Sequence, residues 1–282
     1  MLFRSQWTPG EQAALARLGA FIGGGLDGYA DARDFPAQAV TSRLSPYLRW
    51  GEISPRRIRA AINAAKADNS ISDKGAEKFM SELGWREFSY HLLFNTPTLP
   101  TDNLQPAFNA FPWQHDTAGL SAWQKGETGY PLVDAGMREL RRTGYMHNRV
   151  RMVTGSFLIK HLLIDWREGE KWFWDFLLDA DPANNAASWQ WVAGCGADAA
   201  PFFRIFNPIL QGEKFDGKGE YVKTYIPELA ALQGKQIFSP WALKKDVVSS
   251  TDFVLGRDYP APIVEHEYAR KRALDAFQQI RN

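Results

Sequence analysis

Apolar residues recur at helical spacing along most of the chain, and apolar–polar alternation typical of a strand never exceeds four residues. Residues 9–26 fit an amphipathic helix that ends at the glycines 23–25, and Ser54-Pro55 begins a helix with a capping residue followed by proline. Further helices are predicted over 72–94, 131–143, 147–164 and 265–280. The pattern therefore predicts a nearly all-α protein.

Two stretches break the helical pattern. Residues 96–112 are rich in proline and poor in periodic apolar positions, which predicts a loop. We expect this linker, over about 96–130, to join two helical lobes of a single domain spanning residues 1–282. Residues 212–229 are predicted to form a loop and then a helix that Pro227 interrupts.

Composition narrows the class of protein. A chain of 282 residues with 45% hydrophobic residues can fill a substantial core. No apolar run approaches the roughly 20 residues of a membrane span, and the first residues lack a secretory signal, so we expect a cytoplasmic protein, nucleoid-associated if bacterial, with no membrane partner. Cys195 is the only cysteine and the histidines show no metal-ligand spacing, so we expect neither a disulfide nor a metal site.

The net charge of +1 argues against nucleic-acid binding, but the charge is unevenly distributed. Residues 136–161 hold six basic residues against Glu139, and residues 43–66 hold six against Glu52. Such runs are either solvated helix faces or a surface for phosphates.

Candidate chemistry is concentrated in residues 144–211, which are rich in Trp, Asn and Arg. Asn148, Arg151, Met152 and Gly155 share one helical face, where the small residue would let a flat ligand approach. A second helical face carries Glu82, Trp85 and Arg86, which is either part of a site or a surface ion pair beside a packed aromatic. The hydroxyl-rich turn 41–46 is either a phosphate nest or a helix cap.

Several motifs, in order, resemble the flavin-binding half of the DNA photolyase and cryptochrome family: TSRLSPYLRWGEISPR, WQKGETGYPLVDAGMREL, RTGYMHNRVRM, LLIDWREGE, ANNAASWQW and DAAPFFRIFNP. The resemblance covers the chain from about Trp7 to Trp241. Residues 146–149 and Met152 resemble the cyclobutane pyrimidine dimer photolyases within that family.

The resemblance implies a helical FAD-binding domain of the photolyase type, with the FAD folded into a U and reduced and anionic in its active form. Asn185 would face the reactive nitrogen of the flavin, and Arg151 would pair with Asp179. The cofactor-binding residues implied in this way are Tyr29, Thr41, Ser42, Arg43, Leu44, Ser45, Phe79, Arg151, Asp179, Ala180, Asp181 and Asn185. The family's amino-terminal α/β half, which carries the antenna chromophore, has no counterpart in this sequence, so no antenna chromophore is expected.

The resemblance also implies an activity, that of a monomeric deoxyribodipyrimidine photo-lyase. Light would drive an electron from reduced FAD to a pyrimidine dimer flipped out of damaged DNA. The catalytic residues would be Glu82, Asn185 and Met152, and the electron-transfer residues would be Trp113, Trp166 and Trp189. The residues for DNA and lesion binding would be Arg33, Glu82, Trp85, Arg86, Asn148, Arg149, Trp191 and Gln211.

Burial beside Trp85 would raise the pKa of Glu82, so that the protonated acid could donate to the lesion. The main alternative is a cryptochrome-type blue-light sensor that binds FAD without repair. A helical interaction or DNA-binding module that has lost its cofactor is a third interpretation.

Overall fold

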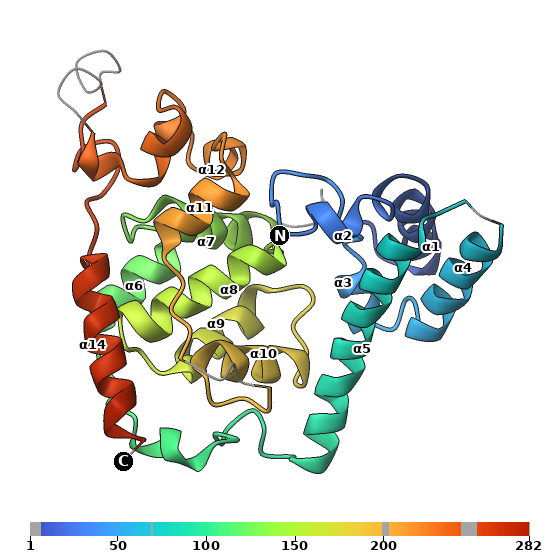
Figure 1. Cartoon of the computed structure of the whole chain (residues 1–282), viewed down its shortest axis with the longest axis horizontal. Coiled ribbons are helices and arrows are strands. Elements are labelled where there is room, and N and C mark those ends of the chain that lie inside the picture. Colours follow the sequence, from blue (N-terminus) through green and yellow to red (C-terminus); the bar gives the residue numbers. More distant parts are fainter. Residues whose placement is uncertain (1–6, 69, 199–202, 244–252, 282) are drawn as a thin grey trace.

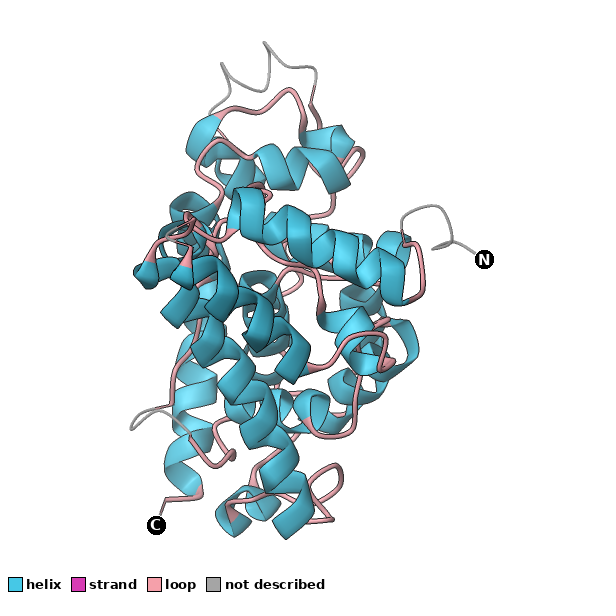
Figure 2. Cartoon of the chain, turned by 90° about the vertical axis from the view of Figure 1, so that its right-hand side faces the viewer, coloured by secondary structure: helices cyan, strands magenta, loops and turns pink. Residues whose placement is uncertain are grey.

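The computed structural model describes residues 7–68, 70–198, 203–243 and 253–281. Within these ranges the chain forms helices and a single isolated β-bridge between Leu255 and Tyr259, with no strand (Figure 2), which confirms the predicted all-α class. None of the helices in these ranges is long and apolar enough to cross a membrane. The DAAPFFRIFNP motif lies partly outside the described residues, at 199–202.

The amino-terminal helices gather at one end of the molecule, on the right of Figure 1. They are α1 (Glu11–Ala20) with the π-helical turn η1 (Phe21–Gly25), α2 (Tyr29–Ala32), α3 (Ser45–Arg49), α4 (Pro55–Ala67) and α5 (Asp73–Asn95). As predicted, Ser54 caps α4, because its Oγ accepts a hydrogen bond of 3.1 Å from the amide of Arg57. Gly75 brings α5 against residue 26, since a Cβ there would lie 2.0 Å from the carbonyl oxygen of Leu26.

The remaining helices form the other part of the molecule, on the left of Figure 1. They are α6 (Thr117–Lys125), α7 (Pro131–Thr143), α8 (Asn148–Ser156) with the π-helical turn η3 (Phe157–His161), α9 (Trp166–Phe176), α10 (Asn184–Ala193), α11 (Pro208–Phe215), α12 (Glu220–Tyr225) and α14 (His266–Gln279). Short 3₁₀ turns complete it: η2 (Pro106–Ala110), η4 (Pro227–Leu229), η5 (Gly234–Phe238) and η6 (Pro240–Ala242). Gly169 of α9 lets α10 pack closely, because a Cβ there would lie 2.2 Å from the ring of Trp189.

Each group of helices has its own hydrophobic cluster. The N-terminal cluster centres on the rings of Phe21, Tyr29 and Phe79, whose centroids lie 4.7–5.7 Å apart. The C-terminal cluster is larger and buries Trp123 and Trp166 completely. Helix α5 leaves the first group and leads, through residues 96–116, along the edge of the second (Figure 1).

Most predicted helices lie where the sequence places them, and three segments need correction. The helix predicted over 147–164 ends at His161, because Leu163 adopts a left-handed conformation (φ 55°) that no helix continues. The predicted linker contains α6, which Asp116 caps by accepting a hydrogen bond of 2.8 Å from the amide of Gly119.

The predicted loop after Gln211 is also shorter than expected. Asn207 caps α11, which continues to Phe215, and the carboxylate of Asp216 then accepts hydrogen bonds from the amides of Tyr221 and Val222 in α12. These caps extend helices into a segment whose apolar pattern is weak.

Candidate functional site

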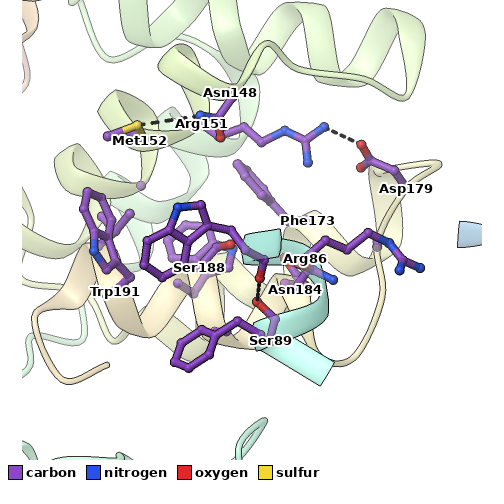
Figure 3. Close-up of a pocket in the computed structure, with 18 of the residues that line it drawn as sticks. Arg86, Ser89, Asn148, Arg151, Met152, Phe173, Asp179, Asn184, Ser188 and Trp191 are labelled. Carbon is purple, nitrogen blue, oxygen red and sulfur yellow. Dashed lines mark hydrogen bonds and ion pairs between the residues drawn. The ribbon is translucent and has the colours of Figure 1, made fainter. Parts of the chain in front are cut away.

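A cavity of about 490 Å³ opens between α5 on one side and α8, α9 and α10 on the other. The two helical faces singled out from the sequence both line it, which confirms those spacing arguments. The predicted site residues that it brings together are Glu82, Trp85, Arg86, Asn148, Arg151, Met152, Asp179, Ala180, Asn185, Trp189 and Trp191. Figure 3 shows many of these side chains arranged around one space.

An ion pair between Arg151 and Asp179 forms the charged wall of the cavity (Figure 3). Arg151 Nη2 lies 2.8 Å from Asp179 Oδ2, and Arg151 Nε donates to the carbonyl of Met146 at 2.7 Å. Burial lowers the pKa of Arg151, but the nearby Asp179 carboxylate outweighs this effect and raises it, so the guanidinium stays charged.

Asp179 also has an acceptor without a partner. Its side chain is 2% exposed, and among the described residues nothing donates to Oδ1. A buried carboxylate oxygen without a hydrogen bond is costly. The cavity therefore fits a ligand that carries an N–H group opposite Asp179.

The turn before α10 is held by Asp181. Its Oδ1 accepts hydrogen bonds from the amides of Ala183 (2.9 Å) and Asn184 (2.7 Å), so this carboxylate fixes the start of the helix. The next residue, Asn185, donates through Nδ2 to Glu170 Oε1 at 2.8 Å. Sequence reasoning missed Glu170 as the partner of Asn185, although it stands in the motif LLIDWREGE.

Glu82 differs from its expected state. Its Oε1 contacts both Arg33 Nη1 and Lys78 Nζ. Burial raises the pKa of Glu82, but the hydrogen bonds from Arg33 and Lys78 outweigh burial and lower it below its ordinary value. The expectation of a raised pKa is therefore wrong. Arg33, which directly follows α2, is far from Trp85 in sequence, so local helical spacing did not reveal this contact.

The flat side chains of the cavity are partly exposed. Trp85 is 50% exposed and meets Phe88 edge to face at 5.7 Å between ring centroids. Across the cavity from α5, Trp191 of α10 and Met152 of α8 also line the space. The sulfur of Met152 is 4.0 Å from Asn148 Nδ2 (Figure 3). These walls can stack against a planar ligand.

The other predicted cofactor residues do not line this cavity: Tyr29, Thr41, Ser42, Arg43, Leu44, Ser45, Phe79 and Asp181. Tyr29 and Phe79 pack in the N-terminal cluster, and burial raises the pKa of Tyr29 to about 12. In the 41–45 turn, Arg43 has a φ of 50° and its guanidinium lies 5.1 Å from the ring centroid of Tyr145.

Three predicted DNA contacts already have protein neighbours or are buried. Arg33 pairs with Glu82. Arg149 pairs with Asp34 at 2.6 Å and lies over the ring of Phe215. Gln211 has a buried Oε1 to which no described residue donates a hydrogen bond.

The predicted tryptophan relay is dispersed through the C-terminal cluster. Trp189 is 3% exposed and contacts the rings of Trp123 and Phe173. Trp166 is fully buried and donates to Asn103 Oδ1 at 2.9 Å, whereas Trp113 is partly exposed. No ring contact among the described residues joins two of the three predicted relay tryptophans directly.

Comparison with known proteins identifies the family that shares this fold. Residues 79–279 match the family described as the FAD binding domain of DNA photolyase. The deoxyribodipyrimidine photo-lyase of Agrobacterium fabrum is 55% identical over 279 residues, which cover 99% of this chain and 58% of that relative.

Solved structures agree. The crystal structure of a bacterial class III photolyase from Agrobacterium tumefaciens matches with a TM-score of 0.96 at 55% identity, over 99% of this chain and 57% of that one. A cryptochrome from Synechocystis matches with a TM-score of 0.91 at 36% identity, over 96% and 56% of the two chains.

The helices and their cavity thus define the fold that photolyases and cryptochromes share. The chain belongs to the family of FAD-binding domains of DNA photolyases. It spans a little over half the length of the relatives that it matches.

Proposed function

We propose that this chain binds FAD and acts as a deoxyribodipyrimidine photo-lyase, repairing cyclobutane pyrimidine dimers in DNA with light. One observation carries the proposal: a single cavity joins the Arg151–Asp179 pair to the side chains of Glu82 and Trp85 on α5 and Met152 on α8. The first group suits an anionic ring with an N–H donor, and the second suits an uncharged pair of linked pyrimidine bases.

The flavin ring of FAD would be held mainly by the charged wall of the cavity. Asp179 Oδ1 would accept from an N–H of the flavin, and Arg151 would balance the charge of the reduced ring. We assign the 41–45 turn, with Tyr29 and Phe79 beside it, to the remainder of the cofactor on the strength of the family motifs. When bound, reduced FAD supplies the electron that opens the dimer.

The lesion would enter between the aromatic walls. Trp85 and Trp191 would stack on the flipped bases and recover part of the few kcal/mol lost on unstacking them from DNA. Asn148 and Met152 would contact the dimer edge, while Arg86 and Arg149 would meet DNA phosphates at the cavity mouth.

Electrons that reduce the flavin would travel through Trp189, Trp166 and Trp113. Support comes from the order of burial, since the first two indoles are buried and Trp113 reaches the surface. Indoles can be oxidised transiently, and their size narrows the gaps between helices.

We further propose that both hydrophobic clusters belong to one domain over residues 1–282, acting as a monomer. The cavity supports this, because its walls come from both sides of one chain. A DNA substrate would put the protein beside the chromosome, in the cytoplasm and, if the host is bacterial, at the nucleoid.

A cryptochrome-type sensor is the second candidate, favoured by the match to the Synechocystis cryptochrome. Repair activity distinguishes the photo-lyase from the sensor. The test combines flavin absorbance of the purified protein with the loss of dimers from an illuminated oligonucleotide. Bound flavin with repair supports the photo-lyase, bound flavin without repair supports the sensor, and protein without flavin contradicts both.

A further inference from the structure

Two cationic side chains contact the same carboxylate oxygen of Glu82, Oε1. Arg33 Nη1 and Lys78 Nζ both contact Oε1, the latter at 2.9 Å. Among the described residues no hydrogen-bond donor contacts Oε2, and Glu82 lines the cavity. The two cations thus contact Oε1, whereas Oε2 has no hydrogen bond from a described residue and can accept one from a ligand.

The neighbouring charges have partners of their own. Across the cavity Arg151 pairs with Asp179, and on the same helix Arg86 pairs with Glu87 at 2.5 Å. Other charged or titratable groups on the surrounding elements include Tyr29, Asp31, which pairs with Lys74, Asp34, which pairs with Arg149, Glu77 on α5, and Asp198 at the cavity wall. The charge of Glu82 is therefore set mainly by Arg33 and Lys78.

We propose that Lys78 is a positioning residue for the lesion site: with Arg33 it holds Glu82 ionised through Oε1, so that Oε2 serves as a hydrogen-bond acceptor for the bound pyrimidine dimer. This inference rests on the proposed function. It replaces the expected role of Glu82 as a proton-donating acid with that of an acceptor, and it gives Lys78, which no family motif marks, a part in lesion recognition.

The two cations contribute differently. Arg33 is 14% exposed and comes from the end of α2, whereas Lys78 is 44% exposed and stands one turn before Glu82 in α5. Burial alone would raise the pKa of Glu82, and the two cations reverse that effect. Removal of Lys78 leaves a single cation, so the carboxyl should take up its proton at higher pH while Arg33 still holds it in place.

The first experiment measures the charge of Glu82 directly. Carboxyl carbons of ¹³C-labelled glutamate are titrated by NMR in the full chain, with Glu82→Gln used to assign the signal. Lys78→Gln should move the Glu82 titration to higher pH. Lys74→Gln is the matched control, because it removes the same charge one turn earlier in α5, where Lys74 pairs with Asp31 at 2.6 Å. An unchanged Glu82 titration in Lys78→Gln overturns the proposal.

The second experiment measures recognition. We expect wild-type protein to prefer a duplex with one thymine dimer over its undamaged counterpart, and to lose that preference as acid protonates Glu82. In Lys78→Gln this loss should begin at higher pH, and at neutral pH the preference should fall by about two- to fivefold, the worth of a partly exposed ion pair. Lys74→Gln should follow the wild type.

Each other outcome has a distinct meaning. Equal weakening of both duplexes in Lys78→Gln, with no change in the pH profile, would make Lys78 a phosphate contact and contradict the positioning role. If the wild type shows no preference for the dimer at any pH, the proposed function fails and the recognition role of Lys78 fails with it. The NMR titration still decides separately whether Lys78 holds Glu82 ionised.

Discussion

Asp179 presents one paired and one unpaired oxygen to the cavity, and this asymmetry yields a prediction at the residue scale. Asp179→Asn keeps the shape of the side chain but removes the charge that balances Arg151. We expect folded protein whose affinity for FAD falls about 10- to 100-fold, the range for loss of a charged hydrogen bond of about 1.5–3 kcal/mol. Asp175→Asn, an exposed neighbour, serves as the control, and flavin fluorescence titration gives the affinity. Wild-type affinity in Asp179→Asn would refute this cofactor contact.

Trp85 and Arg149 should affect DNA binding in different ways. Trp85 is half-exposed at the cavity, so Trp85→Ala should remove most of the preference for a dimer, at about 1–3 kcal/mol per stacked base. Arg149→Ala should weaken binding to damaged and undamaged duplexes alike and reduce the salt slope by about one phosphate contact. Affinities at several salt concentrations separate the two effects. Unchanged discrimination in Trp85→Ala would count against base flipping onto this wall.

Local and long-range interactions explain which residues the sequence could identify. Residues three and four apart on a helix, such as Asn148, Arg151 and Met152, were predictable as one face, and all of them line the cavity. The ionisation of Glu82 was not predictable, because Arg33 lies 49 positions away in sequence. Helical spacing specifies neighbours within an element, whereas the charge of a buried group depends on what tertiary packing brings beside it.

At the scale of elements, Trp166 is the fully buried first residue of α9. Trp166→Phe fills similar space but loses an accessible oxidation and the hydrogen bond to Asn103, at a stability cost of about 1 kcal/mol. We expect light-driven reduction of the oxidised flavin to slow markedly, while repair by chemically reduced protein stays almost unchanged. Trp174→Phe, at a position of α9 that is 44% exposed, controls for indole removal. Normal photoreduction in Trp166→Phe would exclude it from the relay.

The turn η3 is joined to α14 by two buried histidines. His161 Nε2 lies 2.9 Å from His266 Nδ1, and burial lowers the pKa of His161 to about 3. The folded-state pKa is thus below the unfolded value of about 6.5, so this stability is complete above about pH 6.5 and is lost as pH falls toward 3.

We therefore predict that acid destabilises the wild type through this pair. Between neutral pH and about pH 4 the contribution lost is on the order of 3 kcal/mol, and His161→Gln should flatten that part of the pH dependence. Urea unfolding at several pH values measures it, with the exposed His91→Gln as control. An equally steep acid dependence in His161→Gln would contradict the assignment.

The helix boundaries illustrate how far local signals extend. Pro131 at the first position and Gly144, with φ 69° just past the end, specified α7 to the residue. Helices α6 and α11 escaped notice because they are short and depend on their caps, Asp116 and Asn207, more than on an apolar stripe. The helical spacing of apolar residues did not predict the π-helical turns η1 and η3.

At the scale of the whole molecule, contacts between distant segments hold the cavity walls in register. Trp50 Nε1 donates to the carbonyl of Leu178 at 3.0 Å, Arg49 donates to that of Ala180, and Trp7 Nε1 donates to that of Thr143 at 3.0 Å. All three join the amino-terminal helices to the part of the chain that carries Asp179 and Arg151. The separation of these segments in sequence explains why motifs could identify the site while its shape required the structure.

Repair itself tests the central claim most directly. Wild-type protein reconstituted with FAD and reduced chemically is illuminated with an oligonucleotide that contains one thymine dimer, and intact thymines are counted over time. Glu82→Ala and a dark sample are the comparisons, with flavin content matched. We predict that light restores the thymines, that the dark sample does not, and that Glu82→Ala repairs with lower yield, although its oxidised form still undergoes photoreduction in a separate sample. Stoichiometric FAD without any light-dependent loss of dimers would contradict the account.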